Sequence, residues 1–430
     1  ELERSRAKTY REYLSAIGSG YPMTTQAMPT WLRFSRRAFE FNFIAFSFVM
    51  FSCWFPTGFS ATFSTFAFVF ALPIFFYRIR AIQLNRFELM GLALFGWLLL
   101  SVFWSSTPVL ESLGYLSEYR IYFMVPVLTV VLAINERTLR LASTAAMLGA
   151  LIALITSYGL GLGWWQVEGA QLSLANRIYH GFIMSSLLLA CLLIARETAG
   201  VIRLTASAIA MLVIYNVLNI ETGRTGYLQV IFVCLAWALL TFNRAQTIFA
   251  VAVAVIFVGV SYLSFDRFHG RVNQTVANIE KMVVNNDYKS SVGYRLEYYR
   301  GAMGIGMDHP LTGVGVGDVV KTLQSNADRG VIRIRTDNLH SEFMNMLAAG
   351  GLPALFLFLS FVTVIGFSGF AVREQCKWLG DALIGLGGIL LVSSFLNSTI
   401  KDYGEKHALM IVLSLAISSL LMNPSKIARG

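Results

Sequence analysis

Long apolar runs follow one another along most of this chain and restrict it to very few folds. They lie near residues 38–56, 58–76, 87–104, 121–134, 138–160, 179–195, 204–220, 226–242, 246–263, 340–371, 379–399 and 407–422. A helix needs roughly 20 mostly apolar residues to cross about 30 Å of hydrocarbon. Only 13% of the residues are charged, about half the share in soluble domains. The sequence therefore predicts an all-α polytopic membrane protein with about twelve transmembrane helices.

Two of these runs depart from the usual length of a span. The run 121–134 is short, and we expect it to extend back toward Tyr115. The run 340–371 is long, so that helix is expected to tilt or to protrude from the membrane. We expect no cleavable signal peptide, and the first run then serves as the insertion signal.

Basic residues alternate between the short loops and predict the orientation of the chain. One side receives Arg33, Arg36, Arg37, Arg78, Arg80, Arg86, Arg137, Arg140, Arg196, Arg203, Arg244, Arg373, Lys377, Lys426 and Arg429. The opposite short loops carry only Arg120, Arg177, Arg224, Lys401 and Lys406. Because cytoplasmic loops are richer in Lys and Arg, both termini are expected in the cytoplasm. Much of the net charge of +10 follows from this bias, so it requires no nucleic acid partner.

One long polar segment, residues 264–339, divides the chain on the face opposite the cytoplasm. Its apolar spacing predicts helices over 271–284 and 291–306 and a short helix near 318–326, together a compact cap over the spans. The predicted order is a cytoplasmic segment 1–37, nine helices in 38–263, the loop 264–339, three helices in 340–422 and a cytoplasmic tail 423–430. We expect residues 1–22 to be an appended segment, with Met23 or Met28 as the natural start.

The loop ends in Asp337-Asn338-Leu339-His340, at the mouth of the next apolar run. A neutral imidazole has a pKa near 6.5 and can take a proton from a hydroxyl at ambient pH. Asp337 or Glu342 could orient the ring. His340 is therefore the predicted catalytic base, although a histidine at an interface is often structural.

Arg224 stands between glycines in Glu221-Thr222-Gly223-Arg224-Thr225-Gly226, where one run ends and the next begins. Bare backbone N–H groups beside an arginine suit an anion. The alternative is an arginine that reaches the lipid headgroups. Since the short loops on this face otherwise avoid basic residues, we predict that Arg224 binds an anion.

Arg295 and Arg300 flank a Leu-Glu-Tyr-Tyr run in the second loop helix. A guanidinium fork matches a phosphate or diphosphate bidentately, so both are predicted anion ligands. Alternatively, Glu297 pairs with these arginines on a solvated face. Arg267 and Arg271 lie four residues apart, and we expect them to share a helix face that touches lipid headgroups.

Other polar residues on the same face are candidates for support of the site or for substrate contact. They are Arg120, Arg177, His180 and Lys401, besides Asp337 and Glu342. The acidic residues are scattered, and Cys53, Cys191, Cys234 and Cys376 form no metal-type cluster. The glycines of Gly313-Val314-Gly315-Val316-Gly317 lack the strand and helix of a dinucleotide site. We therefore expect no metal and no cofactor.

Three segments resemble the O-antigen ligase family in their order along the chain. They are Glu221 to Gly226, Gly293-Tyr294-Arg295 through His309-Pro310-Leu311-Thr312-Gly313-Val314-Gly315, and Asn338-Leu339-His340-Ser341-Glu342-Phe343 followed by Gly350-Gly351-Leu352. The family often has His-Asn in the last segment, whereas Ser341 follows the histidine here. The number of spans and the position of the long loop also resemble the family.

This resemblance implies a glycosyltransferase in the bacterial inner membrane with a periplasmic active site. The donor would be O-antigen on undecaprenyl diphosphate and the acceptor a hydroxyl of the lipid A-core oligosaccharide, with no nucleotide needed. His340 would take the acceptor proton while Arg224 and Arg295 stabilise the leaving diphosphate. With no paired nucleophile in view, we expect a single displacement that inverts the anomeric configuration.

Two alternatives remain open at this point. An O-antigen polymerase or a protein O-oligosaccharyltransferase would use the same donor with another acceptor. A transporter or flippase of lipid-linked glycan would also need many spans. Transporters, however, usually place charges near the bilayer midplane, and the predicted spans contain very few.

Overall fold

A computed structural model describes residues 29–55, 57–78, 86–166, 176–220 and 223–422. The segments 1–22 and 423–430, together with Glu221 and Thr222, lie outside the described residues. Within those ranges the chain is helical and contains no strand. The all-α prediction is confirmed.

Sixteen α-helices, two 3₁₀ turns (Val102–Trp104 and Ser117–Tyr119) and a short π-helical turn make up the described part of the fold. The helices are α2 (Thr30–Ser52), α3 (Thr57–Arg78), α4 (Arg86–Ser101), α5 (Val109–Leu116), α6 (Ile121–Leu132), α7 (Glu136–Gly161), α8 (Arg177–Glu197), α9 (Gly200–Tyr215), α10 (Arg224–Thr241), α11 (Arg244–Ser264), α12 (Asp266–Asn285), α13 (Ser291–Asp308), α14 (Val319–Asp328), α15 (Glu342–Arg373), α16 (Lys377–Leu396) and α17 (Tyr403–Met422); the π turn is Asn216–Ile220.

Ten helices in the described ranges are long and apolar enough to cross a membrane, and eleven if one bent pair is a single span. That pair, Val109–Tyr119 and Ile121–Leu132, bends by 50°; counted as a single bent span, it extends the short run back past Tyr115. The expected first span falls in α2, which is not among the ten; its N-terminal half carries Arg33, Arg36, Arg37 and Glu40. The protein is a multi-pass membrane protein, with ten or eleven such helices rather than about twelve.

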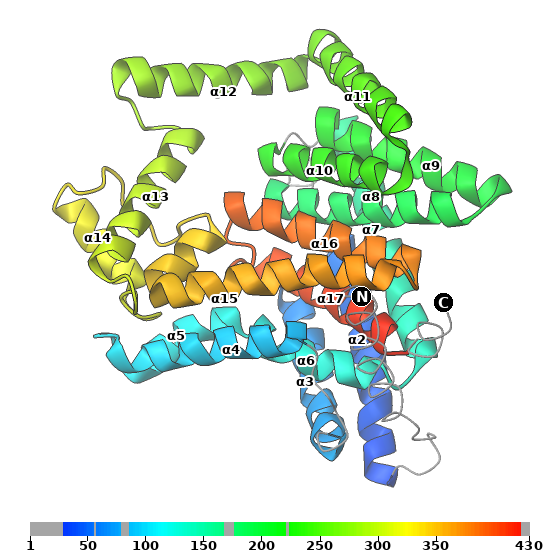
Figure 1. Cartoon of the computed structure of the whole chain (residues 1–430), viewed down its shortest axis with the longest axis horizontal. Coiled ribbons are helices and arrows are strands. Elements are labelled where there is room, and N and C mark those ends of the chain that lie inside the picture. Colours follow the sequence, from blue (N-terminus) through cyan, green and yellow to red (C-terminus); the bar gives the residue numbers. More distant parts are fainter. Residues whose placement is uncertain (1–28, 56, 79–85, 167–175, 221–222, 423–430) are drawn as a thin grey trace, which may run out of the picture.

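Close helix contacts hold the membrane part together, and small residues permit them. α15 packs along α16 and α4, and α8 and α10 pack on α16 (Figure 1). At Gly149 of α7, an added Cβ would lie 2.7 Å from the carbonyl oxygen of Phe48 in α2. Such small residues let helix backbones approach in lipid, where apolar burial gives little drive for association.

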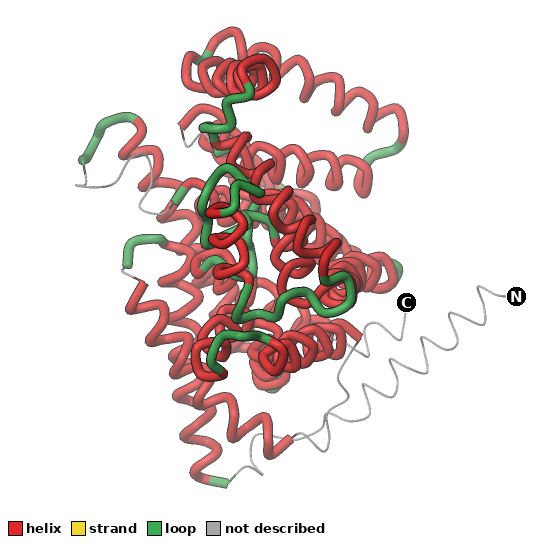
Figure 2. The backbone as a smooth tube through the Cα atoms, turned by 90° about the vertical axis from the view of Figure 1, so that its left-hand side faces the viewer, coloured by secondary structure: helices red, strands yellow, loops and turns green. Residues whose placement is uncertain are grey.

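The polar loop forms the three expected helices, but only two of them make a cap. α13 and α14 pack against the start of α15 through Ala302, Ile305, Leu323, Leu339 and Ala348, all buried. α12 extends away from α11 and returns through α13 (Figure 1), and Phe268 is its only buried residue. Figure 2 looks onto this end and shows loops crossing the helix ends. The compact cap predicted for the whole loop is therefore wrong for α12.

The long α15 is broken near its start rather than straight. Gly351 has φ +70°, and Pro353 follows it. The freed carbonyls of Ala348 and Ala349 accept the N–H groups of Val314 and Gly315. Gly315 itself has φ +86°, and a Cβ there would lie 2.2 Å from the Ser105 hydroxyl. The glycine-rich segment is thus a structural brace for α15.

Candidate active site

His340 lies in a tightly bonded turn that leads into α15. Its N–H donates to the Asn338 side-chain oxygen at 3.0 Å, and the Thr336 hydroxyl donates to the Asn338 carbonyl at 2.6 Å. This Asx-type turn holds His340 at φ +47°, in the left-handed region. A non-glycine residue there costs on the order of 1–3 kcal/mol, so the surrounding bonds fix the backbone of His340.

The imidazole of His340 is held on one edge and one face. Its Nδ1 lies 3.3 Å from Oδ1 of Asn397, and its ring stacks on Tyr298 with centroids 5.9 Å apart. Among the described residues, no hydrogen bond joins the ring to the side chain of Asp337 or Glu342. The Asp337 backbone carbonyl accepts Lys401 Nζ, and the Glu342 carboxylate accepts the Ile400 N–H. An amide, rather than Asp337 or Glu342, therefore orients the ring.

Asn397 belongs to a buried polar network at the turn between α16 and α17. Its Nδ2 donates to Asp402 at 3.0 Å and to Glu405 at 2.7 Å. Asp402 also accepts Nδ2 of Asn338 at 3.0 Å. Asn397 and Glu405 are both fully buried. The acidic residues were expected to be scattered, but the fold brings Asp402 and Glu405 together behind His340.

Arg224 is the first residue of α10 and is half-buried. Its Nε and Nη1 atoms are buried without a hydrogen-bond partner among the described residues. A Cβ at the preceding Gly223 would lie 3.2 Å from the Arg177 carbonyl oxygen, a tight contact. Buried guanidinium donors without an acceptor are costly, which is typical of a site built for an anion.

Two further arginines lie close enough to act electrostatically on Arg224. They are Arg271 of α12 and Arg295 of α13. The ring of Phe268 in α12 meets Tyr227 of α10 at 5.3 Å, and this contact brings Arg271 toward Arg224. We call Arg224, Arg271 and Arg295 the arginine cluster. Arg271 was expected to touch lipid headgroups, whereas the structure places it near Arg224.

Helix α13 connects the arginine cluster to His340. Arg295 lies one turn before Tyr298, which stacks on the His340 ring. Tyr299 donates to the Phe395 carbonyl at 2.7 Å and bonds the Ser341 side chain. Burial lowers the pKa of Arg295 from its ordinary value, although the neighbouring Tyr299 opposes this, and burial raises the pKa of Tyr299. Arginine remains charged at any physiological pH.

Arg300 has a different environment from the arginine cluster. Its Nη1 lies 3.8 Å from Glu297, and Arg333 approaches the same carboxylate at 3.6 Å. Glu297 is buried and also accepts the Arg333 N–H at 2.7 Å. Arg300 therefore pairs with Glu297, which was the alternative expected for the arginines of this helix.

The remaining candidates have structural partners. His180 is buried, with Nε2 2.9 Å from Asn216, which in turn donates to Ser157. Arg120 lies 3.1 Å from His407 Nε2. Lys401 lies 3.6 Å from Glu118. None of these side chains meets His340 in the part of the chain that the structure describes, although Lys401 supports the loop through Asp337.

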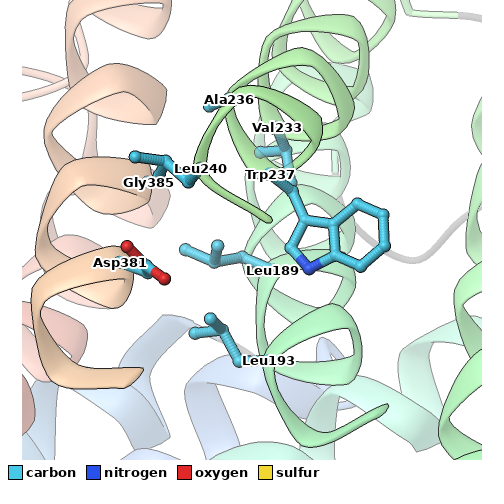
Figure 3. A pocket seen from close by; sticks show the side chains of 8 residues that line it. All are labelled: Leu189, Leu193, Val233, Ala236, Trp237, Leu240, Asp381 and Gly385. Carbon is cyan, nitrogen blue, oxygen red and sulfur yellow. The ribbon is translucent and has the colours of Figure 1, made fainter. Parts of the chain in front are cut away.

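A small apolar pocket lies elsewhere, between α8, α10 and α16 (Figure 3). Asp381 at its edge accepts Arg196 and Arg373. Asp381 and Asn397 are separated by 16 positions, so this pocket is roughly 24 Å along α16 from the His340 network. The described residues contain no group of three or more His, Cys, Asp or Glu placed to hold a metal.

Comparison with known proteins agrees with the motifs. A search of curated proteins gives no match. A family model described as O-antigen ligase matches residues 183–359. This range includes Arg224, Arg271, Arg295 and His340, and it contains the three segments whose order resembles that family. Residues 183–359 are therefore similar to an O-antigen ligase domain, and this match supports the superfamily of O-antigen ligases and polymerases.

Proposed function

We propose that the protein is an O-antigen ligase of the bacterial inner membrane. It would transfer glycan from undecaprenyl diphosphate to a sugar hydroxyl of lipid A-core at the periplasmic face. The observation that carries this proposal is the arginine cluster, in which buried Arg224 donors have no hydrogen-bond partner among the described residues. α13 ties this cluster to a histidine whose Nε2 has no hydrogen bond to the described residues.

The arginine cluster suits the leaving group of this reaction. A diphosphate carries several negative oxygens, and guanidinium groups bind such oxygens through forked N–H donors. Charge grows on the bridging oxygen as the sugar–phosphate bond breaks. Preformed positive groups at that place stabilise the transition state more than the ground state. Because three arginines supply this charge, the proposed reaction requires no metal ion.

His340 suits the other half of the reaction. The acceptor hydroxyl oxygen forms a bond to the anomeric carbon, and the bond from that carbon to the diphosphate oxygen breaks with its electron pair. The acceptor proton passes to Nε2 of His340. A base positioned in this way typically contributes about 10²–10⁴-fold to the rate. One displacement without a covalent enzyme intermediate inverts the anomeric configuration.

The test is a transfer assay with purified protein, undecaprenyl-diphosphate-linked glycan and lipid A-core, in buffer that contains a chelator. A mobility shift of the lipid A-core band that is absent with His340→Ala supports the proposal. Longer glycan on the lipid carrier without a shift would mean a polymerase, and glycan found on a protein acceptor an oligosaccharyltransferase. If neither substrate changes covalently, the transporter alternative is favoured instead.

A further inference from the structure

We propose that Asn397 is a positioning residue that sets the tautomer of His340, with the proton on Nδ1 and a bare lone pair on Nε2. The inference rests on the proposed function, because it specifies how His340 becomes ready to accept the hydroxyl proton. It assigns a role to a residue that neither the motifs nor the family match singles out.

The first step fixes the orientation of the Asn397 amide. Asp402 and Glu405 lie 3.0 and 2.7 Å from Nδ2 of Asn397. The Asp402 carboxylate acts as an acceptor here, since it also accepts Nδ2 of Asn338 at 3.0 Å, and the NH₂ group is the only donor of an asparagine side chain. The NH₂ group must therefore face the carboxylates. Reversing the amide would set its oxygen against the Asp402 carboxylate in a fully buried place.

The second step transfers this orientation to the imidazole. With both N–H bonds of Asn397 directed to Asp402 and Glu405, its Oδ1 is left facing Nδ1 of His340 at 3.3 Å. An amide oxygen accepts, so Nδ1 must carry the proton. In a neutral imidazole the other nitrogen then has the lone pair. Tyr298 covers the ring face, which limits rotation that would exchange the two nitrogens.

The third step concerns charge. When Nε2 takes the acceptor proton, the ring becomes a cation. Asp402 lies behind the ring, one amide away, and its negative charge favours that cation. The same carboxylate holds Nδ2 of Asn338 at 3.0 Å, and Asn338 accepts the His340 N–H. Asp402 thus anchors both the backbone turn and the amide that orients the ring.

The kinetic test compares Asn397→Leu with the double variant Asn397→Asp/Asp402→Asn in the transfer assay. The leucine variant removes the acceptor for Nδ1. The double variant retains it, since the carboxylate now accepts from both the ring and the new amide. We expect kcat of Asn397→Leu to fall on the order of 100-fold or more, with the KM for the lipid-linked donor unchanged. The kcat of the double variant should be at least tenfold higher than that of Asn397→Leu.

The control is Asn345→Leu. Asn345 is equally buried and donates to Ser398 at 2.9 Å, in the same network but without contact to His340. It should keep kcat within about threefold of wild type if its melting temperature is preserved. Equal loss of kcat in Asn345→Leu and Asn397→Leu, or a double variant no better than Asn397→Leu, would overturn the proposal, because either result would mean that the network matters only for folding.

A spectroscopic readout separates this inference from the proposed function. Nitrogen NMR of protein labelled in histidine, with His340 assigned by subtracting His340→Gln, reports which ring nitrogen is protonated. We expect Nδ1–H in wild type and a tautomer mixture in Asn397→Leu, whether or not transfer occurs. A wild-type ring protonated on Nε2 at neutral pH refutes the inference. If the expected tautomer is found but no glycan is transferred, the inference about Asn397 stands and the proposed function is refuted.

Discussion

Replacement of Arg224 by glutamine should make the protein more stable while nearly abolishing its activity. Arg224 places buried Nε and Nη1 donors beside two like-charged neighbours, Arg271 and Arg295. Without an anion, that arrangement raises the free energy of the folded state. Gln keeps a polar side chain of lower volume and removes the charge. Stability and function should therefore change in opposite directions.

The magnitudes follow from the charges and donors involved. At an effective dielectric constant near 20, two unit charges about 8 Å apart repel by about 2 kcal/mol. After screening by salt, relief of the cluster should stabilise the empty protein by about 1–3 kcal/mol, a rise of roughly 2–8 °C in melting temperature. Removal of one preformed donor group at a developing negative charge should lower kcat by about 10²–10³-fold.

The assay measures melting of the purified protein in detergent with and without inorganic pyrophosphate, alongside glycan transfer. At 100 times its dissociation constant, pyrophosphate should stabilise the wild type by about 2.7 kcal/mol and Arg224→Gln far less. Arg335→Gln is the control, since Arg335 is 71% exposed and pairs with Asp328 on the surface; it should alter neither property. A lower melting temperature for Arg224→Gln without pyrophosphate, or equal stabilisation of both proteins by it, would refute the reasoning.

Three other changes test separate parts of the structure. His340→Ala should fold normally and lower kcat by about 10²–10⁴-fold; full activity of the purified variant would eliminate the base assignment. Arg271→Ala should weaken pyrophosphate binding in the melting assay, whereas Arg300→Ala should not, because Arg300 is paired with Glu297. Equal effects of the two substitutions would contradict the assignment of Arg271 to the arginine cluster. Burial alone would raise the pKa of Asp318, but hydrogen bonds from the Thr107 hydroxyl and the backbone of the α4–α5 loop lower it. The ionised Asp318 therefore stabilises the folded state above the unfolded pKa near 3.9, and this stabilisation is lost as pH falls below that value. Asp318→Asn should lower the melting temperature at neutral pH and lower it less near pH 3. A change in melting temperature that does not depend on pH would contradict this.

Local signals in the sequence carry much of this fold. The apolar runs predict the spans, and the helical spacing within the polar loop predicts α12, α13 and α14, because both patterns are properties of single segments. The break in α15 also had a local signal that was missed. Gly350-Gly351-Leu352-Pro353 contains three residues that disfavour helix, yet the apolar content around them predicts one continuous span.

The site is less readable because it depends on contacts between distant segments. His340, Arg224 and Arg295 stand out by their residue type on a face poor in such groups. Arg271 lies near Arg224 only because Phe268 of α12 packs on Tyr227 of α10. The spacing of residues along α12 does not predict that contact. Asn397 lies at the end of an apolar run, where an asparagine also suits an ordinary helix end.

The charges of the site are divided in a way that matches the proposed transfer. The arginine cluster gathers positive groups from α10, α12 and α13, whereas the Asp402 carboxylate lies behind His340, just before α17. In the proposed reaction, negative charge grows on the leaving diphosphate while the imidazole becomes positive. The negative charge on the diphosphate therefore develops near positive groups, and the positive charge on the imidazole develops near a negative group. Since Arg295 and Tyr298 are three positions apart on α13, the spacing between the two halves is set by one helix, and a change that moves α13 should impair both together.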